Sequence, residues 1–146
     1  MIIDNANLFT GNAGQNFTAT ANGTNDIDLG MTALTGGTYG DADGGAQLNL
    51  FVACTAAVPA ANTSVVITLL TADDTAFSVN SATLFTSAAI TTWTAGTNIL
   101  QIVVPRGFRR YLRLTLTVTN NFTSSNIVAG LTRDVDTAEA AVYQHD

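Results

Sequence analysis

The sequence predicts an all-β protein, a two-sheet antiparallel sandwich of jelly-roll type with about eight strands and extended terminal arms. The first observation is residues 111–119, where apolar and polar side chains alternate strictly, as in a strand with one buried face. The second is that turn residues separate short β-branched segments at a spacing typical of sandwiches. The third is that only residues 135–143 have a helix-forming composition.

The N-terminal third predicts two short strands and a long loop. Residues 17–21 and 27–29 have strand-forming composition, and Asn22-Gly23 between them predicts a hairpin turn. Gly30 ends the second strand, and the glycine-rich residues 35–45 predict a loop.

The centre of the chain predicts the inner strands. Apolar side chains alternate with others over residues 48–55, and residues 65–71 are so rich in β-branched and apolar types that we expect a central strand buried on both faces. Asp73-Asp74 predicts a turn in which the carboxylates cap their own backbone, with Phe77 packed beneath it. The other predicted strands are residues 83–86, 90–93, 99–104, 111–119 and 127–132.

The length of 146 residues suits one domain, which we place at residues 1–146. We expect an N-terminal arm at 1–10 and a C-terminal arm or short helix at 134–146. With four leucine and valine side chains on one face of residues 111–119 alone, the chain has enough apolar residues for a core without disulfides; Cys54 is its single cysteine.

The charge and hydropathy disfavour two classes of partner. A net charge of −6 and a pI near 4.3 argue against nucleic acid, because phosphate binding needs a basic surface. Apolar runs stay far short of the ~20 residues that a membrane span needs. The first residues lack the basic region of a secretion signal, so we expect none here.

Few residues are suited to catalysis. The only histidine, His145, lies one residue from the end of the chain, where ends fray. Cys54 shares a predicted strand face with apolar residues, which favours a buried, unreactive thiol. A glycosidase would need two carboxylates in one cleft, and Glu139, the only glutamate, lies in the predicted C-terminal arm. We therefore expect no enzyme, no catalytic residue and no cofactor.

Aspartates give the candidate metal ligands. Asp26 and Asp28 flank Ile27 on one strand face and together could bind a cation, although a polar strand edge beside a turn is the favoured interpretation. Asp41-Ala42-Asp43 resembles the start of a calcium loop but lacks the later ligands and the closing glutamate. We therefore expect no metal site.

Four of the five arginines are concentrated in eight residues: Arg106, Arg109, Arg110 and Arg113. One interpretation is a turn whose exposed positions are occupied by arginine. The other is an electropositive patch that docks on an acidic protein, pairing its guanidinium groups with carboxylates. Tyr111 shares the outward face with Arg113, and this combination is common at the centre of protein interfaces. The residues leave both interpretations open.

Several segments, in this order, resemble the Bbp16-like capsid cement proteins of tailed bacteriophages. They are Met1-Ile2-Ile3-Asp4-Asn5 with Leu8-Phe9, then residues 24–30, 66–74 with Phe77, 105–114, and Phe122 with 127–131. The resemblance implies a jelly-roll cement, or decoration, protein without catalytic residues. Such a protein lies on the outside of the icosahedral head as a homo-oligomer and locks neighbouring major capsid proteins together.

From this resemblance we expect a virion protein on the outer surface of the capsid, assembled in the cytoplasm of the host bacterium. Dimers and trimers at capsid symmetry axes are both open. The expected contacts to the capsid protein or to sister subunits are Ile2, Ile3, Arg106, Arg109, Arg110, Tyr111 and Arg113. The alternative is a receptor- or carbohydrate-binding sandwich of a tail fibre, in which Trp93, Tyr39 and the acidic loop would form a sugar site. A depolymerase, which would need a second carboxylate near Glu139 or a metal at Asp41 and Asp43, is the third choice.

Overall fold

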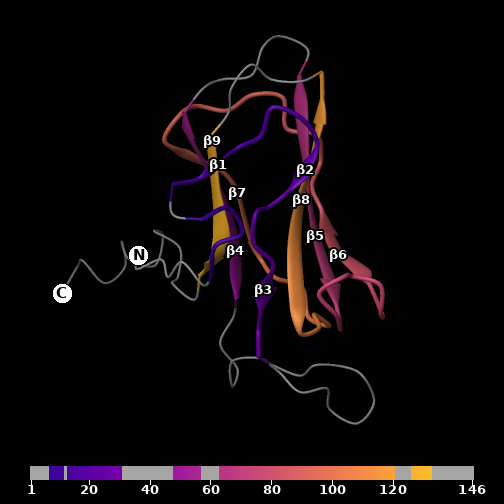
Figure 1. Ribbon diagram of the computed structural model, residues 1–146. Coiled ribbons are helices and arrows are strands. Elements are labelled where there is room, and N and C mark those ends of the chain that lie inside the picture. The colour runs from indigo at the N-terminus through magenta and orange to yellow at the C-terminus, as the bar shows by residue number, and fades with distance from the viewer. Residues whose placement is uncertain (1–6, 12, 31–47, 57–62, 121–125, 133–146) are drawn as a thin grey trace, which may run out of the picture.

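The computed structural model describes residues 7–11, 13–30, 48–56, 63–120 and 126–132, which fold into two facing antiparallel sheets (Figure 1). Sheet A has the strand order β1-β9-β4-β7, and sheet B has the order β2-β8-β5-β6, with β3 also paired to β8. The strands are β1 (Gln15–Asn16), β2 (Ala21–Asn22), β3 (Ile27–Asp28), β4 (Asn49–Ala56), β5 (Ser64–Ala72), β6 (Ala82–Thr86), β7 (Thr97–Val103), β8 (Tyr111–Thr119) and β9 (Asn126–Thr132).

The strand order is that of a jelly roll. Because β2 and β3 both pair with the same strand, β8, they count as one interrupted strand. The chain then has eight strands in the described residues; sheet A holds the first, eighth, third and sixth, and sheet B the second, seventh, fourth and fifth. This arrangement confirms the predicted fold class.

Strand β8 is at the centre of the fold, as its alternating sequence predicts. It pairs with β5 without interruption from Ser64↔Thr119 to Ala72↔Tyr111. Its apolar side chains Leu112, Leu114 and Leu116 are fully buried between the sheets.

The prediction that β5 is buried on both faces is wrong. Val65, Ile67 and Leu69 are fully buried, but the intervening side chains are only half-buried. The reason is that β5 belongs to one layer of a two-layer fold, so no second described layer covers its outer face.

The hairpin predicted at Asn22-Gly23 is also wrong. Residues on both sides of this dipeptide pair with β8, and Gly23 itself continues that ladder through a hydrogen bond from its N to the Leu114 carbonyl oxygen, at 2.8 Å. Gly23 is needed for a close approach instead, because a Cβ at this position would lie 2.6 Å from the carbonyl oxygen of Phe9.

Residues 8–10, which the sequence placed in an N-terminal arm, connect the two sheets. The Phe9 N–H donates to the Ala129 carbonyl of β9 at 2.9 Å, while the Phe9 carbonyl accepts from the Asn25 N–H, also at 2.9 Å. The Phe9 side chain is fully buried in the core. These contacts show that the β9 side of sheet A faces the β2 and β3 side of sheet B.

Three further segments differ from their predictions. Of the predicted strand 17–21, only Ala21 lies in a strand, β2. Residues 90–93 form no strand: Ile90 makes a single bridge to Val65, and Trp93 turns into the core. The two-residue strand β1 was not predicted, because so short a segment has no periodicity. Within the described part of the chain, no helix has the length and hydropathy needed to cross a membrane.

Candidate functional site

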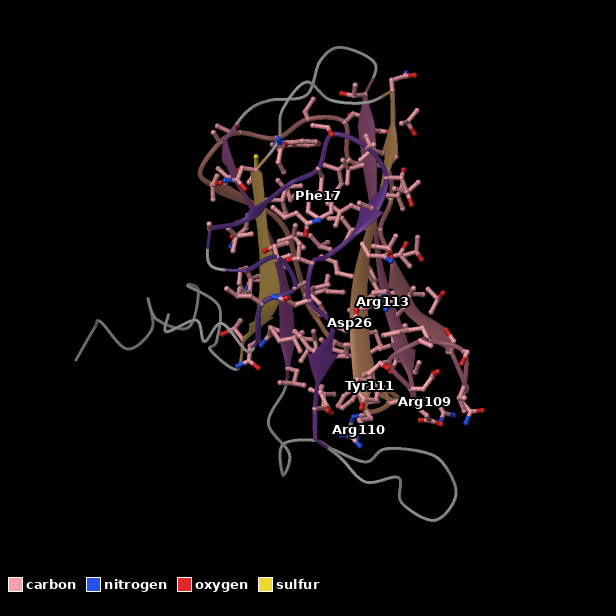
Figure 2. All side chains as sticks on the ribbon, in the orientation of Figure 1. Phe17, Asp26, Arg109, Arg110, Tyr111 and Arg113 are labelled. Atoms are coloured by element: carbon pink, nitrogen blue, oxygen red, sulfur yellow. The ribbon has the colours of Figure 1, made fainter. Side chains whose placement is uncertain are left out.

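The predicted arginine cluster lies where β8 begins, at one end of sheet B. Figure 2 shows Arg109, Arg110, Tyr111 and Arg113 there, with Asp26 close to Arg113. The backbone reaches this end through Gly107, whose φ of +94° is a conformation that favours glycine.

Arg113 forms a two-pronged ion pair with Asp26. Its Nε donates to Asp26 Oδ1 at 2.8 Å and its Nη2 to Oδ2 at 2.6 Å. The two side chains are only 22% and 24% exposed. The hydrogen bond that Arg113 donates to Asp26 is the main cause that raises the pKa of Arg113 above its usual value, because it stabilises the charged form.

A ring and a carbonyl complete the surroundings of Arg113. The guanidinium carbon lies 4.1 Å from the centre of the Phe77 ring, which is cation–π geometry. Nη2 also donates to the Thr75 carbonyl at 3.3 Å. Arg113 of β8 therefore binds both the residue before β3 and the loop after β5.

Arg110 pairs with Asp28 in the same two-pronged manner. Nε to Oδ1 and Nη2 to Oδ2 are both 2.9 Å, but the side chains are 41% and 43% exposed. The hydrogen bond from Arg110 is the main cause that lowers the pKa of Asp28, and the Gly30 N–H adds to it. The guanidinium also lies 5.1 Å from the centre of the Tyr111 ring.

Arg109 pairs with Asp73, the first residue after β5. Its Nη1 lies 2.9 Å from Asp73 Oδ2 and 3.1 Å from Oδ1. Its backbone N–H donates to the buried Thr71 Oγ1 at 2.6 Å. The backbone and the side chain of Arg109 are therefore both bound at the end of β5.

Asp74 caps its own turn, as the sequence predicts. Its Oδ1 accepts from the backbone N–H groups of Ser78 and Val79, both at 2.9 Å, and its Oδ2 accepts from the Ser78 hydroxyl at 2.6 Å. The Ser78 hydroxyl is the main cause that lowers the pKa of Asp74.

The ion pairs leave this cluster close to neutral rather than electropositive, which argues against the second of the two interpretations. The three paired arginines already hold carboxylates of their own chain, and only the exposed Arg106 has no ion pair to a described residue. The four arginines are balanced by four aspartates: Asp26, Asp28, Asp73 and Asp74. Whether the cluster touches a partner stays a prediction.

Sequence reasoning considered Asp26 and Asp28 as cation ligands and missed their arginine partners. The signal was present: each aspartate flanks the buried Ile27, just as Tyr111 and Arg113 flank the buried Leu112, and Ile27 pairs with Leu112. Among the described residues, no group of three or more acidic, histidine or cysteine side chains could hold a metal.

The outer face of sheet B is a second candidate surface, which we call the hydroxyl face. Cross-strand pairs place Thr68 beside Thr115 and Val66 beside Thr117. The Thr115 hydroxyl donates to Asn22 Oδ1 at 2.8 Å, which extends this polar row to β2. The hydroxyl face consists of Val66, Thr68, Leu70, Thr115 and Thr117.

The other candidates do not form a site. Cys54 is fully buried, as predicted. Trp93 is only 7% exposed and packs into the core, which leaves little of its ring for stacking on a sugar. An open hollow of about 370 Å³ beside it is lined by Thr92, Trp93, Thr94, Thr97, Asn98 and Ile99.

Several sequence candidates lie outside the described residues. They are Ile2, Ile3, Tyr39, Asp41, Asp43, Glu139 and His145, together with the predicted C-terminal arm.

The fold and these surfaces define a jelly-roll β-sandwich whose described ionic groups are largely paired within the chain. A comparison with protein-family profiles matches residues 12–131 to the Bbp16 family. Because this match spans most of the chain, the protein belongs to the Bbp16 family. A search of curated proteins finds no match.

Proposed function

We propose that the protein is a bacteriophage capsid cement protein, which binds the outer surface of the icosahedral head and locks adjacent major capsid protein subunits together. Its membership of the Bbp16 family and the resemblance of its segments to capsid cement proteins support this function. In this proposal it acts by binding alone, as a homo-oligomer, and carries out no reaction.

The hydroxyl face is the observation that carries the proposal. Its threonine, valine and leucine side chains are half-buried or exposed and carry no charge, and the neighbouring Arg113 has its charge matched by Asp26. Burying such a face against another protein leaves no isolated charge without a partner, which would otherwise oppose association.

The composition favours association in a second way. The chain has no lysine and only 11% charged residues. Threonine and asparagine lose fewer rotamers on burial than lysine does, so ordering this surface costs less conformational entropy.

Binding several coat subunits at once would stabilise the head. A ligand that binds the assembled lattice and not the separate subunits shifts the equilibrium toward the lattice by mass action. When one molecule contacts several subunits, their separation requires several contacts to break together, which raises the overall avidity.

Adding the protein back to heads tests the proposal. Heads purified from a virus that lacks this gene are mixed with the chain and then pelleted through a cushion. We expect saturable binding and a higher disruption temperature of the filled heads. A Thr68→Arg, Thr115→Arg variant that stays folded should bind less, with Thr68→Ser, Thr115→Ser as control. Failure of the wild type to bind would contradict the proposal.

A further inference from the structure

The outer edge of β7 offers a second surface that could bind a partner, apart from the hydroxyl face. Among the described strands, β7 is the last of sheet A and pairs with β4 alone. Its seven residues include no charge and no proline. Natural sheet edges are usually protected by such residues, and an edge without them is a template for another strand.

The register shows which backbone groups face outward. The Val104 N–H donates to the Leu48 carbonyl, and the same register continues through Ile102 and Leu100. In an antiparallel ladder, alternate residues point their N–H and C=O groups to opposite sides. The backbone groups of Gln101 and Val103 therefore point away from β4, and no described strand pairs with them.

Side-chain burial is lower along this edge than in the neighbouring strand. In β4, the neighbouring strand, the core-facing Leu50 and Val52 are fully buried, whereas Leu100 and Ile102 of β7 are only partly buried. Val103, on the other face of the edge, is 50% exposed and is one of two large apolar side chains exposed among the described residues.

Sheet B also has partly buried apolar side chains on this side. Residues 8–10 join the β9 side of sheet A to the β2 and β3 side of sheet B. The other ends of the two strand orders, β7 and β6, therefore lie together on the far side of the sandwich. Leu84 and Phe85 of β6 are partly buried as well. A strand with apolar side chains at alternate positions would bury these side chains further.

We propose that the β7 edge accepts an extended segment of the coat subunit by strand addition. The segment hydrogen-bonds to the backbone of Gln101 and Val103 and places alternate apolar side chains over Leu100 and Ile102. This inference rests on the proposed function and names how one coat subunit is held, on a different surface from the hydroxyl face.

A second copy of the chain fits this edge less well. The register of β7 against β4 shifts between Val52 and Ala53, which leaves Ile99 as a bulge and limits the regular edge to four residues, Leu100–Val103. Two folded domains joined through so few residues bury far less than the ~800 Å² per partner of a stable interface. A flexible segment does not need so large a rigid interface, because its own backbone adapts to the bulge.

Proline at position 101 tests the proposal without breaking the fold. Gln101→Pro removes an outward N–H that β4 does not use, and proline is tolerated on a sheet edge in this orientation. Gln101→Thr keeps the N–H and is the control. With heads lacking the protein as the probe, we expect Gln101→Thr to bind as the wild type does and Gln101→Pro to bind about tenfold more weakly. In the bound wild type, the amides of Gln101 and Val103 should gain protection from hydrogen exchange.

Each other outcome overturns the proposal in a distinguishable way. If the wild type binds heads, Gln101→Pro binds equally well and the two amides gain no protection, strand addition is wrong and the cement function stands. If the wild type does not bind, both fall. If sedimentation shows a free dimer that Gln101→Pro dissociates, a second copy occupies the edge. Should Gln101→Pro fail to fold, Val103→Pro and the exchange measurement on the wild type decide.

Discussion

The ion pair between Arg113 and Asp26 should contribute measurably to stability, unlike most pairs at a protein surface. Its two charged hydrogen bonds are 2.8 and 2.6 Å long, and both side chains are less than one-quarter exposed. Hydrogen bonds to charged groups contribute about 1.5–3 kcal/mol, and exposed ion pairs about 0–1 kcal/mol. Because this pair lies between those limits, we expect a coupling free energy of about 1.5 kcal/mol.

The single substitutions should differ in a defined order. Arg113→Ala removes the ion pair and also the cation–π contact with Phe77, which contributes about 0.5–1 kcal/mol. We therefore expect Arg113→Ala to lower the free energy of unfolding by about 2–3 kcal/mol, and Asp26→Ala by about 1.5–2 kcal/mol.

A double-mutant cycle measures the coupling directly. The assay is urea unfolding followed by the fluorescence of Trp93, the single tryptophan of the chain, which is buried. The matched control is the cycle on Arg110 and Asp28, which have the same two-pronged geometry but are about 40% exposed. There we expect a coupling of about 0.5 kcal/mol. A coupling near zero at Arg113–Asp26, or a larger one at the control pair, would refute the reasoning.

Three further predictions concern stability. Because the pKa of Asp28 is lowered from 3.8 on folding, its carboxylate stabilises the fold above that pH, and this stability is lost as the pH falls through the lowered pKa. Urea midpoints below pH 4 should therefore fall less in Asp28→Asn than in the wild type. Equal acid slopes in the two proteins would contradict this. Leu114→Ala should cost about 2–5 kcal/mol and Thr117→Ala under about 0.5 kcal/mol in the same assay, because only the first side chain is fully buried; similar costs would place the core elsewhere. Gly23→Ala should cost about 2 kcal/mol, because its Cβ would meet the Phe9 carbonyl oxygen at 2.6 Å, and a neutral effect would mean that this approach is looser.

The fold was largely predictable because its central strand repeats a clear pattern. Burial alternates along β8 as the sequence alternates, and its bounds match the predicted 111–119. The errors arose where tertiary packing outweighed local preference. Asn22-Gly23 has the composition of a hairpin turn, but Gly23 follows β2, hydrogen-bonds to β8 and lies against Phe9.

The site was harder to predict, because charge pairing depends on which strands are neighbours. The arginines of 106–113 look electropositive in sequence, and Asp26 and Asp28 lie more than eighty residues away from their partners. Only the β3–β8 register brings them together. The open edge of β7 was equally hidden, since a strand's position at the edge of a sheet leaves little trace in its own sequence.

The copy number on purified heads tests the central proposal most directly. Virions are separated into heads and tails, and the chain is quantified against the major capsid protein by mass spectrometry, with a cryo-EM map of the heads to locate it. A cement protein should be found on the heads, at a fixed ratio to the coat subunit, as density outside the shell that touches more than one subunit. Recovery only with the tails, or absence from the head surface, would contradict the proposal.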